Sequence, residues 1–247
     1  IVSSGVFNMR GFAMVLGGDL TIPNGVDLVL SSSGIIDGQG NNLIFEGTGR
    51  ILYDSHVSAT LRNLRLKNVA NHGSGKASLG IKREQQAWLN LQNAELWLSS
   101  NYSFTAARLY INNDVILSGT NSFIYTSTQQ SVITSNGMLL VDQGTTFSFA
   151  PTTGSSGAKD LFAMADKTAT LALDGATLIV SNTGMRLTRG TVLLDNAVVL
   201  RSGGGVSYDT SIIFGNSAAG SNSDVDIKLL SGAQVAVQGK IFYDGVN

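Results

Sequence analysis

Apolar and polar residues alternate along most of the chain in a pattern that recurs. Each copy has an apolar residue, any residue and an apolar residue, then a polar pair, a small residue and a second alternating stretch. The pattern is clearest at 89–98 and 171–180, and a third copy at 228–237 places Lys228 where the first apolar residue is expected. Each alternating half predicts a strand with one buried face, and the polar pair predicts a turn between two strands.

A third short strand follows a second turn in several copies. Three strands and three corners per copy predict one coil of a solenoid with a triangular cross-section. Leu89 and Leu109 are 20 residues apart and Leu171 and Val192 are 21 apart, so we expect coils of about 20–23 residues. Positions that represent the third strand are Phe123 or Ile124, Met185, Leu187, Val206 and Tyr208.

Sequence repeats are expected in a solenoid because equivalent positions of successive coils meet the same environment about 4.8 Å apart. The aligned copies predict that Leu173 stacks on Leu194, and Leu178 on Val199, inside the coil. The alternative is an antiparallel sandwich, which turn pairs such as Asn136-Gly137 favour because they close hairpins.

The whole chain, 1–247, is expected to form a single domain because no charged or Pro-rich linker divides it. Longer gaps between copies contain turn-rich segments, which predict loops that project from the coil. These loops are expected near 71–80, 150–160 and 215–224.

Composition supports an all-β chain. Hydrophobic residues make up 43%, charged residues only 13%, and there are 29 glycines. The net charge of -1 argues against a nucleic-acid or anionic-membrane surface, and the absence of cysteine excludes disulfides and Cys-ligated metals. No apolar run approaches the roughly 20 residues of a membrane-spanning helix. The first residues, 1–5, carry no signal-peptide pattern, so the chain is expected to be processed or trimmed.

Three early segments, 18–30, 34–43 and 59–68, carry a family resemblance. Its most specific motif is the run Ile36-Asp37-Gly38-Gln39-Gly40. They resemble the opening coils of the right-handed parallel β-helix, or pectate lyase-like, superfamily. This superfamily includes pectate lyases, polygalacturonases, phage tailspikes and bacterial surface proteins. The resemblance implies a single-stranded right-handed parallel β-helix, with three short strands per coil, and it does not carry an activity with it.

The catalytic motifs of these relatives are incomplete here. A polygalacturonase-like site needs paired carboxylate motifs, and only faint echoes of its other motifs are present, at 71–74 and 81–83. Lyases of this fold use calcium held by clustered Asp residues. Candidates for such a cluster, or for a catalytic groove, are Asp142, Asp174, Asp195 and Asp209.

The remaining candidates favour structural roles. Asp174 and Asp195 occupy the same turn of successive copies and are interpreted as turn residues. His56 and His72 have no carboxylate or Cys at ligand spacing, and 203–209 is a single copy of a calcium-loop-like pattern. Alternation is expected to turn about half of the clustered aromatics into the core, the alternative being a sugar-stacking face; these aromatics are Phe123, Tyr125, Phe147, Phe149, Phe242 and Tyr243. No catalytic, metal or cofactor residue is therefore predicted.

Two classes of function stay open. The first is a non-catalytic extracellular or cell-surface structural protein, either adhesin-like or a filament that associates end to end, because 1–7 and 239–247 both look like strands without a helical cap. The second is a polysaccharide lyase or glycoside hydrolase that acts on a uronate-containing polymer. A polysaccharide or a host surface is a further expected partner.

Overall fold

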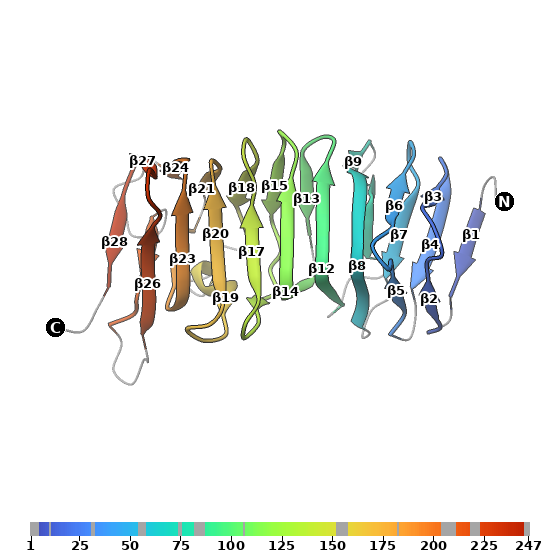
Figure 1. Ribbon diagram of the computed structural model, residues 1–247, viewed down its shortest axis with the longest axis horizontal. Coiled ribbons are helices and arrows are strands. Elements are labelled where there is room, and N and C mark those ends of the chain that lie inside the picture. The colour runs from blue at the N-terminus through green and yellow to red at the C-terminus, as the bar shows by residue number, and fades with distance from the viewer. Residues whose placement is uncertain are drawn as a thin grey trace.

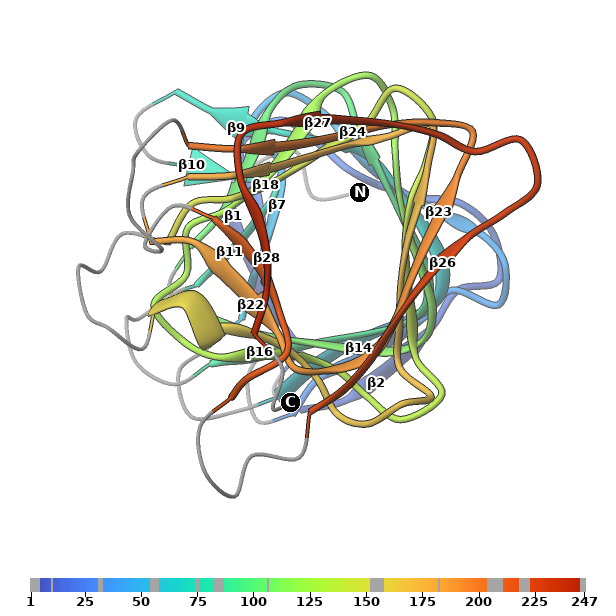
Figure 2. The ribbon, with the colours of Figure 1, turned by 90° about the vertical axis from the view of Figure 1, so that its left-hand side faces the viewer.

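The chain forms an elongated stack of short strands that follow one another in sequence order from end to end (Figure 1). Viewed along the long axis, the strands line the sides of a closed outline (Figure 2). This computed structural model describes all residues except 1–4, 10, 31–32, 54–57, 74–75, 82–86, 106, 152–157, 182, 204–210, 218–222 and 245–247.

Five sheets account for the strands of the described residues. The largest contains β2 (Ala13–Val15), β3 (Leu20–Ile22), β5 (Ile35–Asp37), β6 (Asn42–Phe45), β8 (Ser58–Val69), β12 (Trp88–Leu98), β14 (Arg108–Ser118), β16 (Ser131–Ile133), β17 (Met138–Val141), β19 (Phe162–Met164), β20 (Thr170–Asp174), β23 (Arg189–Asp195) and β26 (Asp224–Leu229). The second contains β13 (Tyr102–Phe104), β15 (Ser122–Tyr125), β18 (Thr146–Phe149), β21 (Thr177–Val180), β24 (Ala197–Ser202) and β27 (Gln234–Gln238).

The smaller sheets complete the outline. One contains β1 (Gly5–Asn8), β4 (Val26–Leu30), β7 (Arg50–Tyr53) and β11 (Leu79–Ile81), and another contains β22 (Met185–Leu187), β25 (Ile212–Phe214) and β28 (Ile241–Tyr243). The last is an antiparallel pair of β9 (Asn71–His72) with β10 (Lys76–Ala77), which occupies part of the segment 71–80. A 3-10 turn, η1 (Ala158–Asp160), lies within 150–160.

The chain is all-β, and every strand pairing of the described residues except that of β9 with β10 is parallel. Parallel pairing excludes the antiparallel sandwich. Strands pair with strands of the next repeat rather than with the next strand along the chain, so Leu89 lies beside Leu109 and Leu173 beside Leu194, as predicted.

Two details of the predicted register are wrong. Leu178 lies beside Leu200, and Val199 lies beside Thr177. One more residue separates Asp195 from Leu200 than separates Asp174 from Leu178, and this shift keeps Val198 and Leu200 on the buried face. A repeat matched at constant spacing misses such an insertion.

Lys228 does not occupy an inward position. It lies beside Leu193, while Ile227 lies beside Val192 and takes the first inward place of the copy. The third copy therefore begins one residue earlier than the pattern indicated, and the Lys228 side chain is 58% exposed.

Asparagines in the left-handed region bend the longest strands. Asn63, Asn93 and Asn113 have φ of 52°, 47° and 53° and lie in the middle of β8, β12 and β14. Asn tolerates this conformation better than most residues because its short side chain bonds locally. Each long strand therefore covers the two predicted strands of a copy, and Asn93 Nδ2 donates to Asn63 Oδ1 at 3.1 Å across the bend.

Stacked aromatic rings fill part of the core. Phe123, Tyr125, Phe147 and Phe149 are all at most 1% exposed, so all four lie in the core, where alternation predicted about half of the aromatics. Residues two apart in a strand project from the same face, so Phe123 and Tyr125 both face inward, as do Phe147 and Phe149. The ring centroids of Tyr125 and Phe149 are 5.5 Å apart and nearly parallel.

Candidate functional site

Three of the four candidate aspartates lie in one row. Asp174 lies beside Asp195, and Asp142 follows Val141, which lies beside Leu173. These carboxylates serve the corner: Asp174 Oδ1 accepts from Asn196 Nδ2 at 2.5 Å, and Asp195 Oδ1 accepts from the Asn196 N–H at 2.8 Å. Asp209 lies outside the described residues.

The described residues contain no group of three His, Cys, Asp or Glu side chains that could hold a metal ion. The bonds that Asp174 and Asp195 accept from Asn196 support the turn interpretation that their sequence position indicated.

The echoes of hydrolase motifs serve the β9–β10 hairpin where they are described. Asn71 Oδ1 accepts from the Ser103 N–H at 3.1 Å, and Asn71 Nδ2 donates to Ser103 Oγ at 3.1 Å. His72 Nε2 lies 3.2 Å from Ser78 Oγ, and burial lowers the pKa of its imidazole. Positions 74, 82 and 83, His56 and 204–209 lie outside the described residues.

A polar groove of about 540 Å³ crosses the outer face of β6, β8, β12 and β14. Its central ion pair joins Arg65 Nε to Glu95 Oε2 at 2.5 Å, and Ser118 Oγ donates to Glu95 Oε1 at 2.6 Å. Trp97, 41% exposed, follows Glu95 by two residues and so projects from the same face of β12. The polar side chains that line the groove are Asn42, Asn63, Arg65, Asn93, Glu95 and Asp114.

The N-terminal end of the stack exposes interior side chains. Phe7 is 47% exposed, although it lies beside Leu28, an inward residue of the next strand. Among the described residues, β1, β2 and β3 each pair with a strand on one side only. Together the end strands form an apolar hollow of about 330 Å³, whose lining includes Phe7, Met14, Leu20, Ile22, Val26 and Leu28.

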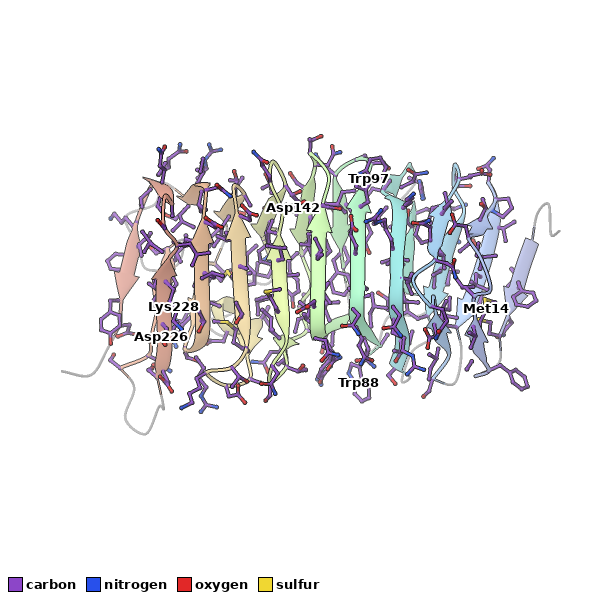
Figure 3. The ribbon with its side chains drawn as sticks, in the orientation of Figure 1. Met14, Trp88, Trp97, Asp142, Asp226 and Lys228 are labelled. Carbon is purple, nitrogen blue, oxygen red and sulfur yellow. The ribbon has the colours of Figure 1, made fainter. Side chains whose placement is uncertain are left out.

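The C-terminal end has the same character. Leu229 lies beside the buried Leu194 and Tyr243 beside the buried Phe214, yet they are 61% and 76% exposed. The end strands β26, β27 and β28 also pair on one side only among the described residues. Figure 3 shows Lys228 and Asp226 on the last strand of the largest sheet and Met14 near the opposite end.

Among the described residues, both ends therefore combine exposed apolar side chains with strands that pair on one side only. A further layer of strands would bury these side chains and pair with these strands. Sequence reasoning anticipated strand-like ends but not the inward residues, because the apolar pattern of 228–237 was placed one residue late. The alternation of Ile227 and Leu229 is the signal that identifies them.

No helix in the part of the chain that the structure describes is long and apolar enough to cross a membrane. Comparison of the chain with protein-family models, with curated proteins and with solved structures finds no match.

Proposed function

We propose that this chain is a non-catalytic structural protein that associates end to end into filaments at the cell surface or outside the cell. Its layers of strands would be the coils of one right-handed parallel β-helix with three short strands per coil, as in the surface proteins of the pectate lyase-like superfamily that the early segments resemble. The observation that carries the proposal is the open apolar interior at both ends of the stack.

The arrangement of pairings supports the coil. In the largest sheet each strand pairs with the equivalent strand of the next repeat, from β3 at one end to β26 at the other. Two neighbouring parallel strands need a connection that leads from the end of the first back to the start of the second. Here that connection has to travel round the outline of the stack. A winding chain provides that connection without long crossings.

Stacking of copies would cover the exposed apolar side chains. Full burial of an aliphatic or aromatic side chain contributes up to about 1.5–3 kcal/mol. Association costs about 4–15 kcal/mol in lost freedom. Several such side chains must be covered at each end to offset that cost, among them Phe7, Leu229 and Tyr243. Backbone hydrogen bonds between the end strands would stabilise the contact further. The expected contact is concentration-dependent and, because it joins two different surfaces, it need not close, so a filament can result.

The proposal is tested by sedimentation velocity and negative-stain microscopy of the purified chain over a wide concentration range. We expect axial assemblies that lengthen with concentration. Leu229→Asp should shorten or abolish them by placing a charge in the contact, whereas Thr120→Asp, which adds the same charge at an exposed corner within the stack, should not. Monomers at every concentration would contradict the proposal.

A second candidate is action on a uronate-containing polysaccharide, favoured by the groove lined by Arg65, Glu95 and Asp114 and by the exposed Trp97 on the same face of β12. Indole faces stack on sugar rings, and carboxylates accept bonds from hydroxyl groups or transfer protons. Release of reducing ends or unsaturated products from a panel of uronate polymers, with Glu95→Gln as the matched variant, tests this candidate.

A further inference from the structure

One face of the molecule carries an uninterrupted register from end to end. Its strands are β3, β6, the second halves of β8, β12 and β14, then β17, β20, β23 and β26, and each pairs in parallel with the next. Among the described residues this row of strands has two edges without a further strand, β3 near the N-terminal end and β26 near the C-terminal end (Figure 1).

The register assigns Leu229, the last residue of β26, an equivalent in Leu20, the first residue of β3. An inward column, followed pair by pair, joins Leu229 to Leu20, and its members between these two are all buried. The column consists of Leu20, Leu43, Leu66, Leu96, Leu117, Val141, Leu173, Leu194 and Leu229.

The outward column one residue earlier ends in opposite charges. It begins at Asp19, which directly precedes Leu20, and ends at Lys228. Asp19 keeps this place because its Oδ1 accepts from the N–H and Nδ2 of Asn42, the next member of the column, at 2.8 and 2.9 Å.

Neighbours in this outward column bond to each other elsewhere. Arg65 and Glu95 are successive members and form the 2.5 Å ion pair of the groove. Lys228 has a carboxylate 3.9 Å away on its own strand, Asp226, and its ammonium group is 58% exposed at the free edge. A carboxylate one strand further along would complete the pattern.

We propose that the C-terminal end of β26 in one copy lies in parallel beside the start of β3 in the next, so that Leu229 stacks on Leu20 and Lys228 faces Asp19. The inference rests on the proposed end-to-end assembly and specifies its register. Parallel strands are about 4.8 Å apart, so the columns would continue across the junction without change.

The other faces permit the same junction. Seen along the axis, β1 and β28 lie on one side of the outline (Figure 2), so the first and last strands of that side would also meet. A one-residue slip at the junction would place Leu229 beside Asp19 or Thr21, which are outward positions, and would separate Lys228 from Asp19, so apolar contact and opposite charge both favour this register.

Charge reversal tests the register. Lys228→Asp and Asp19→Lys should each lower the association constant on the order of tenfold at low salt, because each places like charges across the junction. The double variant should recover most of the loss, since it restores an opposite pair. Lys167→Asp and Asp114→Lys are the matched controls, with the same charge changes at exposed positions within the stack, and should have little effect.

A second measurement uses the absence of native cysteine. A chain with Asp19→Cys and Lys228→Cys should form a ladder of disulfide-linked multimers on mild oxidation, because bridged Cα atoms are about 4.4–6.8 Å apart. Single-cysteine chains stop at dimers. Asp19→Cys with Lys240→Cys, the second cysteine being outside this row of strands, should give no ladder.

The outcomes distinguish the proposed register from end-to-end assembly itself. If the unaltered chain assembles but neither charge reversal nor the cysteine pair behaves as stated, the register is wrong and end-to-end assembly stands. If the unaltered chain does not assemble at any concentration, both are wrong. If a charge variant loses its circular dichroism signal and so does not fold, the cysteine pair decides the register. A ladder of linked multimers supports the register, and the absence of a ladder contradicts it.

Discussion

Replacing Phe147 by alanine should cause a large loss of stability. Phe147 is 0% exposed, and its ring centroid lies 5.2 Å from that of Phe162 and 5.9 Å from that of Phe123. Burial of a phenylalanine contributes about 1.5–3 kcal/mol. Each aromatic pair adds about 0.5–1.5 kcal/mol. We expect Phe147→Ala to lower the free energy of unfolding by about 3–5 kcal/mol, since a cavity also remains.

The assay is urea unfolding, followed by circular dichroism and by hydrogen exchange. Hydrogen exchange is needed because a stack of similar layers can open locally, and a single transition then underestimates the local effect. The control is Thr146→Ala, a partly exposed neighbour on the same strand, which should cost much less. A loss below about 1 kcal/mol for Phe147→Ala, with unchanged exchange in β15 and β18, would refute the packing argument.

Three further predictions concern single positions. Leu173→Asp should cost several kcal/mol, because it buries a charge beside Leu194, and a soluble variant of unchanged melting temperature would contradict the register. Gly38→Ala should lower the unfolding midpoint because its Cβ would come within 2.2 Å of Leu64 Cβ, whereas Gly17→Ala meets nothing within 4 Å and should not. Hydrogen bonds from Ser135 and Thr168 lower the pKa of Asp166 from 3.8 to about 2, so its stabilising effect is present above pH 3.8 and is lost as the pH falls through about 2. Asp166→Asn should therefore flatten acid unfolding curves in that window, and identical curves would contradict this assignment.

Much of the strand arrangement follows from sequence alone. The repeated alternation at 89–98 and 171–180 predicts strands with one buried face, and its spacing predicts pairing between repeats rather than between adjacent strands. Leu173 beside Leu194 confirms that expectation. The physical reason is that a buried column needs an apolar residue at every level, so the requirement is written repeatedly into the chain.

The corners were decided by tertiary structure. An extra residue between Asp195 and Leu200 places Leu200, not Val199, beside Leu178, and Lys228 points outward rather than inward. A corner absorbs one residue with little effect on the strands it joins, so constant spacing cannot locate it. Only the burial of Val198 and Leu200 selects the register.

Candidate sites depended even more on the three-dimensional arrangement. The row of Asp174 and Asp195 was anticipated from their shared turn, whereas the groove around Arg65 and Glu95 was not. These two residues are 30 apart in sequence and form an ion pair only because β8 and β12 lie side by side. Sequence patterns thus determine which residues face inward, since burial recurs locally along each strand. Tertiary structure alone decides which outward residues of different layers meet, because nothing in the alternation of one strand specifies its neighbour.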